Sequence, residues 1–236
     1  MDTIEQFNSH VMQTYDRLPL VMESGSGRTC TDEDGKRYLD FGSGIGTNSL
    51  GYCDPAWADA VCAQVRSMQH TSNYYYTKVQ ADFAERLCQI TGYKRVFFGN
   101  SGAEANECAI KLARKYSFDK YGAGRNVIIT LRNSFHGRTM ATLSATGQDC
   151  FHNYFFPFPE GFVYAEANDI DDLLKKMHNN VCAVMLEYIQ GEGGVVPLDS
   201  KYVDQLYDFC AKRDILVIAD EVQTGVGRTG TFLAGE

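Results

Sequence analysis

The sequence predicts an α/β fold in which a mainly parallel sheet is flanked by helices. From about residue 49 onward, short apolar segments alternate with segments of helical periodicity. This alternation is typical of parallel strands joined by helical crossovers. Clusters of polar residues follow directly after several of the apolar segments. Because ligands of such sheets bind at the carboxyl ends of the strands, those clusters are where a functional site is expected.

The first 48 residues are expected to form a small segment of helix and β hairpin. Residues 4–15 place apolar side chains near one helical face, and residues 23–28 are rich in turn formers. Short strands are expected at residues 29–31 and 37–41. The Asp34-Gly35 pair between them is a strong hairpin signal. A domain boundary is therefore placed between residues 48 and 49.

Residues 49–236 are expected to form one large domain. Helices are expected at residues 54–68, 81–91, 102–116, 170–178 and 200–212. Strands are expected at residues 95–98, 126–131, 162–164, 181–189 and 215–219. Asp54 and the proline after it open the first of these helices, and Asn168 or Asp169 caps the one that starts at residue 170. The strand at 126–131 is rich in β-branched residues, which favour strands.

Composition excludes several classes of protein. The 236 residues carry a formal net charge of -8, and an acidic chain without a basic block is a poor match for nucleic acid or an anionic membrane. The polar N-terminus resembles neither a secretory signal nor an anchor, and no apolar stretch is long enough to span a bilayer. The eight cysteines form no C-x-x-C pair, and no histidine cluster has metal-ligand spacing. We expect free thiols in a reducing cytoplasm and no metal.

Two polar clusters follow early strands of the predicted sheet. In the first, at residues 99–107, Ser101, Gly102 and Ala103 precede a helix, where backbone N–H groups and the helix dipole favour an anion. An ordinary helix cap has the same residues, so both interpretations stay open. In the second, Phe135 could lie on a flat ring and Arg138 could grip a carboxylate, although a core phenylalanine and a solvated arginine are the simpler interpretation.

A histidine and two further clusters complete the candidate set. His136 is interpreted as a hydrogen-bonded structural residue. Glu187 and Glu192 follow a very apolar strand and need partners, which could be a ligand or an arginine in a structural ion pair. Asp220 ends the last strand, where its carboxylate could hold a ring nitrogen protonated, and Gln223 could bond a ring oxygen. A metal ligand or a helix cap is the alternative for Asp220.

The glycines at residues 225–230 match the G-x-G-x-x-G pattern of dinucleotide-binding proteins. That fingerprint also needs a helix that opens at the glycines and an acidic residue about twenty positions later. Neither can be shown before residue 236, and no helix signal is present. A nicotinamide-binding protein is therefore the third hypothesis for function.

Taken in order, the four clusters closely resemble the signature blocks of class III aminotransferases, and the match covers nearly the whole chain. It begins at residues 34–41 and continues through 44–51. Within that family, the run at residues 72–77 is most similar to acetylornithine aminotransferases. The resemblance implies the fold type I large domain, here incomplete at its C-terminal end, and pyridoxal 5'-phosphate as cofactor. It also implies a homodimer with active sites at the interface.

The resemblance assigns a role to each candidate residue. Ser101, Gly102 and Ala103 hold the cofactor phosphate. Phe135 and Val222 pack on opposite faces of the ring, Asp220 pairs with its nitrogen, and Gln223 approaches its hydroxyl. Arg138 binds the substrate α-carboxylate, Glu187 supports the substrate site from beneath, and Glu192 corresponds to the family's switch glutamate.

The sequence departs from the family pattern in two places. Tyr188 stands where the family usually has proline, so the strand exit is expected to be less rigid. The family's Schiff-base lysine lies beyond residues 220–225, and no lysine follows Lys212. The final strands and the C-terminal small domain are also expected to be missing. We therefore expect this polypeptide, taken alone, to be inactive and prone to aggregation.

The function implied is transfer of an amino group from N-acetylornithine to 2-oxoglutarate, in arginine biosynthesis. Ornithine, succinylornithine and 4-aminobutyrate aminotransferases remain alternatives, because Arg138 would recognise a carboxylate common to several donors. A non-catalytic gene fragment is the competing hypothesis from another class.

Overall fold

The computed structural model describes residues 2–236. These residues form two compact units, and the boundary along the chain falls between Thr77 and Lys78. This division differs from the boundary expected between residues 48 and 49. Helix α2 (Pro55–Ser67) and the segment after it belong with the first unit. The assignment of functional domains remains a prediction, and each unit is described below by itself.

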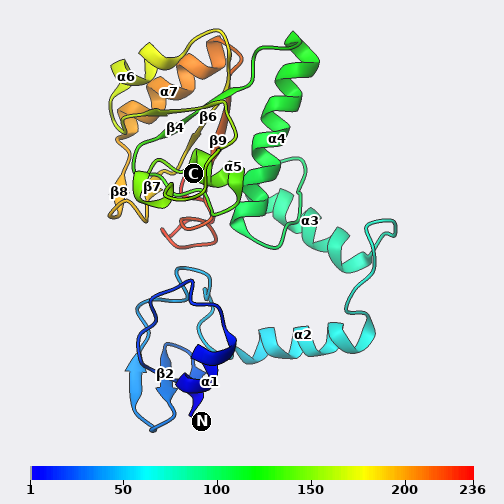
Figure 1. The fold of residues 1–236 in the computed structure, drawn as a ribbon. Helices are drawn as coiled ribbons and strands as arrows, with labels where there is room; N and C mark the ends of the chain where they lie inside the picture. Colours follow the sequence, from blue (N-terminus) through cyan, green and yellow to red (C-terminus); the bar gives the residue numbers. More distant parts are fainter. Residues whose placement is uncertain (1) are drawn as a thin grey trace. The chain divides into compact units, whose positions relative to one another are not determined.

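The first unit contains a small antiparallel sheet and two helices (Figure 1). Its elements are α1 (Thr3–His10), β1 (Met22–Ser26), β2 (Thr29–Asp32), β3 (Arg37–Leu39) and α2. The strand order is β1-β2-β3. The predicted hairpin is confirmed, because β2 pairs with β3 and Gly35 takes a φ of 79° in the turn between them. Asp54 caps α2 by accepting a hydrogen bond from the Trp57 N–H at 2.9 Å.

Two expectations for this unit were wrong in detail. Helix α1 ends at His10 rather than near residue 15, and none of its residues is buried. An apolar face without a surface to cover it adds little to the stability of a short helix. Strand β1 was expected to be a turn, because its small polar residues show no apolar alternation. It forms because its backbone pairs with β2 and because Gly25 leaves room for the Tyr52 ring, which an added Cβ would meet at 2.5 Å.

The second unit contains a four-stranded parallel sheet, which confirms the predicted fold class. Its elements are α3 (Lys78–Thr91), α4 (Gly102–Tyr121), β4 (Val127–Leu131), α5 (Met140–Ala145), a 3-10 turn (Asp149–Phe151), β5 (Phe162–Ala165), α6 (Ile170–Lys176), β6 (Val181–Leu186), β7 (Ile189–Gln190), β8 (Val196–Pro197), α7 (Ser200–Lys212) and β9 (Leu216–Ala219). The strand order is β5-β4-β6-β9, and every neighbouring pair is parallel. Strands β7 and β8 form a separate antiparallel pair.

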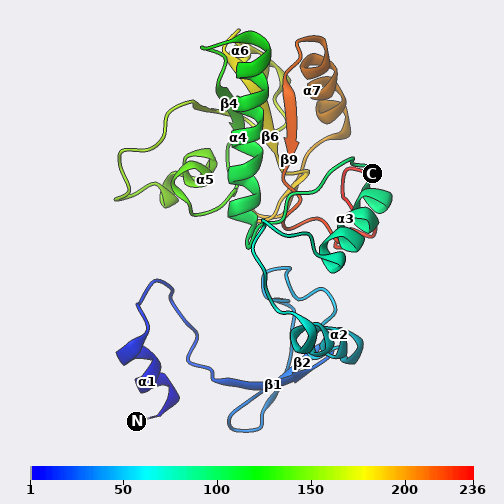
Figure 2. The ribbon, with the colours of Figure 1, turned by 90° about the vertical axis from the view of Figure 1, so that its right-hand side faces the viewer.

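Helices cover both faces of the parallel sheet, as Figures 1 and 2 show. Helices α6 and α7 pack on one face through Leu173 and Leu206, while α4 and α5 pack on the other through Ile110 and Ala145. Strand β6 runs between them with all six residues buried. A strand buried on both faces must be apolar throughout, which explains the unbroken run at residues 181–186.

Most predicted helices and strands of this unit are confirmed to within a turn, but two segments differ. Residues 95–98 form no strand among the described residues, and Phe97 in the middle is 62% exposed. An apolar pattern identifies an extended segment but cannot supply the neighbouring strand whose hydrogen bonds define a sheet. The strand expected at 181–189 is interrupted at Glu187, because its ladder with β9 ends at the pair Leu186 and Ala219.

The carboxyl ends of the strands lie at one edge of the sheet, and this register positions the candidate site. Leu131 of β4 is level with Ala165 of β5, and Leu186 of β6 is level with Ala219 of β9. The Asp220 N–H then donates to the Leu186 carbonyl at 2.7 Å. The polar segments that follow β4, β6 and β9 therefore emerge next to one another.

Candidate functional site

Asp220 is the centre of a buried polar cluster at the carboxyl end of β9. Its side chain is 4% exposed. Oδ2 accepts hydrogen bonds from Asn106 Nδ2 at 2.7 Å and from His136 Nδ1 at 2.8 Å, and Oδ1 accepts from the Val222 N–H at 3.0 Å. A buried carboxylate needs such partners, because burial removes its hydration. Helix α4, the segment after β4 and the segment after β9 thus meet at one carboxylate.

The start of α4 lies directly against the segment that follows Asp220. A Cβ added to Gly102 would lie 2.6 Å from Val222 Cγ1, so only glycine permits this approach. Ser101 is the N-cap of the helix, and its Oγ accepts from the Glu104 N–H at 3.1 Å. The hydroxyl hydrogen of Ser101 is therefore still available to an anion. The helix start and the carboxylate, which the sequence predicted to share a site, do lie together.

The segment after β4 packs onto the same helix start. Gly137 takes a φ of 133°, and a Cβ on it would lie 2.8 Å from Ala103 Cβ. Phe135 is half-buried, with its ring edge-on to Phe151 at a centroid distance of 5.7 Å. Arg138 is exposed, and its guanidinium lies 4.2 Å from the centroid of the Phe151 ring. Phe135 and Arg138 therefore flank the cluster from the β4 side.

Glu187 is a second buried carboxyl group at this edge of the sheet. It is 6% exposed, and its Oε2 accepts from the Phe135 N–H at 3.0 Å. Burial raises the pKa of Glu187 to about 7, and the nearby charge of Asp220 acts in the same direction. The group is therefore poised to change its charge near neutral pH. Of the two interpretations left open by the sequence, an ion pair with arginine is not formed among residues 2–236.

Two further predicted residues lie on turns beside the cluster. Gln223 reaches the turn after β7, where a Cβ on Gly191 would lie 1.6 Å from Gln223 Oε1. Glu192 is exposed on that turn, and among residues 2–236 it makes no hydrogen bond to Asp220. Gln223 is thus brought to the site by close backbone packing, whereas Glu192 is not part of the buried cluster.

Tyr188, where the family usually has proline, leaves the sheet with two anchoring contacts. Its carbonyl accepts from the Leu198 N–H at 2.9 Å, and its hydroxyl lies 2.6 Å from the Tyr207 hydroxyl. These contacts restrain the strand exit. The expected loss of rigidity stays a prediction.

Sequence reasoning missed Asn106. This residue lies on the stripe of α4 that faces the sheet, together with Ile110, Ala113 and Ser117, all of which are buried. A polar amide at one end of a buried stripe is the signal that could have identified it, because such a group needs a partner. Its Nδ2 donates both to Asp220 and to the His136 carbonyl at 2.9 Å. The interpretation of His136 as a hydrogen-bonded residue is confirmed.

Two alternative sites were considered, one for a dinucleotide and one for a metal ion. No helix opens at residues 225–230 in the structure, so the dinucleotide fingerprint lacks its main structural element. Across residues 2–236, no group of three or more histidine, cysteine, aspartate or glutamate side chains is arranged to hold a metal ion. No disulfide is formed by the eight cysteines. Over the same part of the chain, no helix is both long and apolar enough to cross a membrane.

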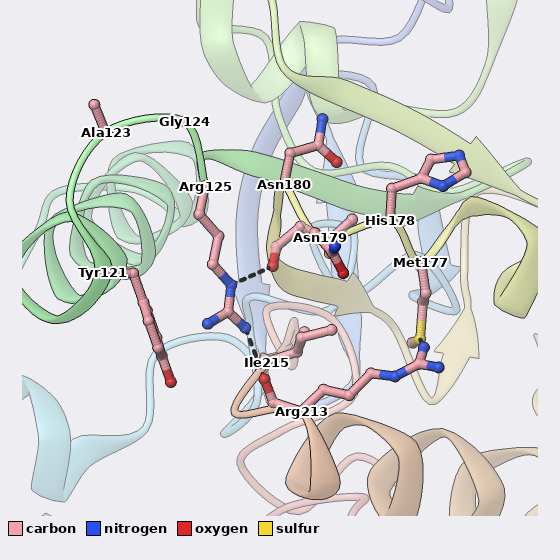
Figure 3. Close-up of a pocket in the computed structure, with 11 residues that line it drawn as sticks. Tyr121, Ala123, Gly124, Arg125, Met177, His178, Asn179, Asn180, Arg213 and Ile215 are labelled. Carbon is pink, nitrogen blue, oxygen red and sulfur yellow. Dashed lines mark hydrogen bonds between the residues drawn. The ribbon is translucent and has the colours of Figure 1, made fainter.

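A surface pocket lies away from the candidate cluster. Figure 3 shows it between the loop after α4 and the loop after α6, with Arg125 and Arg213 projecting into it. These loops precede β4 and β6, so the pocket lies at the amino ends of the strands. Arg125 already donates to the backbone carbonyls of Val181, Arg213 and Asp214. The pocket contains none of the predicted site residues and is not assigned a function.

The residues at the carboxyl ends of the strands suit a phosphorylated aromatic cofactor. A helix start built from small residues offers backbone N–H groups to a phosphate. A buried carboxylate lies beside it, and a half-buried aromatic ring borders it. Pyridoxal 5'-phosphate, the cofactor that the family implies, has the matching phosphate, basic ring nitrogen and flat ring. The residues present therefore fit this group.

Comparison with known proteins agrees with this arrangement. The chain is 54% identical over 235 residues to the acetylornithine aminotransferase of Haemophilus ducreyi, covering 99% of this chain and 60% of that protein. It is 47% identical over 227 residues to the enzyme of the same name from Caldanaerobacter subterraneus, covering 96% and 58%. The chain thus spans about 60% of the length of the curated relatives it matches.

Solved structures give the same result. The ornithine aminotransferase of Toxoplasma gondii superposes with a TM-score of 0.93 at 33% identity, over 98% of this chain and 56% of that one. The N-acetylornithine aminotransferase of Stenotrophomonas maltophilia gives 0.82 at 36% identity, over 98% and 57%. The class-III aminotransferase family matches residues 11–236. This chain therefore belongs to the class-III aminotransferases, whose cofactor is pyridoxal 5'-phosphate.

Proposed function

We propose that the protein containing this chain transfers an amino group from N-acetylornithine to 2-oxoglutarate, as a step of arginine biosynthesis. The observation that carries the proposal is the buried Asp220 carboxylate beside the glycine that opens α4. The names of two similar relatives support the donor. When bound, pyridoxal 5'-phosphate supplies an electron sink for chemistry at the substrate α-carbon.

The residues of this chain would hold the cofactor at three points. Ser101, Gly102 and Ala103 would bind the phosphate at the α4 N-terminus. Asp220 would accept a hydrogen bond from the ring nitrogen and keep a proton there. Phe135 and Val222 would pack on the two faces of the ring, and Gln223 would bond the ring hydroxyl. Val222 is 59% exposed, so its side chain is accessible to a ligand.

Three charged residues would handle the substrates. Arg138 would bind the α-carboxylate of the donor and then that of 2-oxoglutarate, because guanidinium and carboxylate match in a bidentate geometry. Glu192 is exposed on the turn after β7 and would pair with an arginine outside these 236 residues when the donor is bound. Glu187 would support the site from beneath, as a residue that binds the Phe135 backbone.

Ornithine is the second candidate donor, because the Toxoplasma ornithine aminotransferase superposes so closely. Succinylornithine and 4-aminobutyrate are further donors in the same class. A non-catalytic product is the alternative of a different kind. We also propose that the protein is a homodimer. We propose a cytoplasmic location as well, which agrees with the eight free cysteines.

A polypeptide of these 236 residues is proposed to have negligible activity by itself. Residues 213–236 contain no lysine, and the family's cofactor-bonding lysine follows the segment at 220–225. We propose that the polypeptide, without that amine, neither bonds the cofactor nor moves the α-proton in the family's way.

Kinetics on the full-length protein test the proposal. Purified protein loaded with pyridoxal 5'-phosphate is assayed for glutamate formation from 2-oxoglutarate with each of the four donors. We expect N-acetylornithine to give the highest kcat/KM. A higher kcat/KM with ornithine or 4-aminobutyrate would reassign the donor, and no turnover with any of the four would overturn the proposal.

A further inference from the structure

The two oxygens of Asp220 are not equivalent. A carboxylate oxygen has about two acceptor directions. Oδ2 receives two donors from the protein, Asn106 Nδ2 and His136 Nδ1, and its acceptor capacity is filled. Among residues 2–236, Oδ1 receives only the Val222 N–H, so one acceptor direction remains within this part of the chain. Any ligand that donates a hydrogen bond to Asp220 must therefore use Oδ1.

His136 is fixed in the position from which it donates. Its side chain is fully buried. Its backbone N–H donates to Thr146 Oγ1 at 3.0 Å, and its backbone carbonyl accepts from Asn106 Nδ2 at 2.9 Å. Asn106 thus binds the histidine backbone and Asp220 at once. Hydrogen bonds at the backbone N–H and carbonyl of His136 fix the position of its imidazole. Because Asn106 and His136 both bind Oδ2, the Asp220 carboxylate has little freedom to rotate.

The contacts of the ring indicate which nitrogen carries the hydrogen. His136 Nδ1 lies 2.8 Å from a carboxylate oxygen, a distance that requires a hydrogen between the two atoms. His136 Nε2 is buried and has no partner in the described residues. A neutral imidazole with its hydrogen on Nδ1 satisfies the bond to Asp220 and leaves Nε2 as a bare acceptor. The Nε2-protonated tautomer would set two lone pairs against each other.

From these contacts we propose that Asn106 and His136 are positioning residues for Asp220. They fill Oδ2 and hold Oδ1 open toward the start of α4 as the acceptor for the cofactor's ring nitrogen. The inference rests on the proposed function for the identity of the cofactor. It adds which oxygen acts, which two side chains aim it, and which tautomer of His136 is required.

Amide replacements separate a positioning role from a merely structural one. Asparagine at position 136 can present an amide N–H close to where Nδ1 lies, whereas glutamine presents one nearer the position of Nε2. Both are smaller than histidine and polar, so a structural role would be weakened similarly by either. A positioning role predicts that His136→Asn is tolerated and that His136→Gln is not.

The first measurement is the dissociation constant of pyridoxal 5'-phosphate, by absorbance titration of the full-length apo-protein. His136→Asn is expected to bind within roughly threefold of wild type. His136→Gln and Asn106→Leu are expected to bind roughly tenfold more weakly or worse, as for loss of a hydrogen bond to a charged group. The control is His152→Asn, because His152 is largely buried in the same unit and bonds the Leu143 carbonyl instead. It should bind like wild type.

The second measurement needs neither cofactor nor variant. Nitrogen-15 chemical shifts of the histidine rings in the wild-type apo-protein should show one ring with hydrogen on Nδ1 and a bare Nε2. Equal affinities of the Asn and Gln variants would overturn the inference, and so would a His136 ring with hydrogen on Nε2 alone. Either result would leave the proposed function standing, provided that the wild-type protein binds the cofactor. Absence of cofactor binding by wild type would remove the proposed function itself.

Discussion

Replacing Glu187 by glutamine should make the apo-protein more stable above neutral pH. The carboxyl group is 6% exposed, and its pKa is raised from 4.5 to about 7 because burial penalises the charged form. Folding therefore favours the protonated acid. The resulting stability is fully present below pH 4.5 and is lost as the pH rises through about 7. A glutamine carries no charge at any pH and escapes this loss.

The size of the effect follows from that pKa. A rise from 4.5 to about 7 corresponds to roughly 3 kcal/mol of free energy between the two protonation states. The variant and wild type should be equally stable near pH 4, and the variant should be more stable by up to about 3 kcal/mol above pH 7.5. The glutamine oxygen can still accept the Phe135 N–H, so the packing of the segment after β4 is kept.

Urea denaturation of the full-length apo-protein between pH 4 and pH 9 measures this difference. The control is Glu160→Gln, because Glu160 is exposed. It should leave the stability within about 0.5 kcal/mol of wild type at every pH. A Glu187→Gln variant less stable than wild type at pH 8 would refute the reasoning. It would mean that the charged form is stabilised by a partner.

Three further predictions concern other parts of the molecule. Gly102→Ala should destabilise the protein by about 1–3 kcal/mol in urea, because its Cβ would lie 2.6 Å from Val222 Cγ1, and a second change, Val222→Ala, should recover part of that loss. Asp214→Asn should lower the melting temperature at pH 7. A hydrogen bond from Lys120 lowers the pKa of Asp214 to about 2. The extra stability of wild type over the variant is therefore present above pH 3.8 and is lost as the pH falls through 2. Arg138→Lys should raise KM for 2-oxoglutarate roughly tenfold with less change in kcat, since lysine cannot bind a carboxylate bidentately; an unchanged KM would remove Arg138 from the substrate site.

The sequence predicted the sheet well where a segment's own residues decide its structure. Strand β6 is apolar because both its faces are covered, and the helix predicted at residues 200–212 is α7 at its observed bounds. Residues 95–98 have the same apolar character, yet no neighbouring strand pairs with them among the described residues. A ladder depends on a second segment, and one segment's composition cannot report it.

In the candidate site, too, the residues that the sequence predicted are those whose own segment identifies them. Asp220 was predicted because it ends an apolar strand and lies in a cluster that resembles a signature block of the family, and the structure places it among buried partners. Asn106 was missed because its role depends on meeting a residue 114 positions later in the chain. The raised pKa of Glu187 likewise comes from burial by other segments. What the sequence could not provide is the set of contacts between distant segments.

A crystal structure of the full-length protein with pyridoxal 5'-phosphate would test the central claim most directly. Our account predicts the ring nitrogen within about 3 Å of Asp220 Oδ1, with the phosphate on the backbone N–H groups of residues 101–103. A cofactor bound elsewhere, or a ring nitrogen that contacts Oδ2 with Asn106 and His136 displaced, would contradict it.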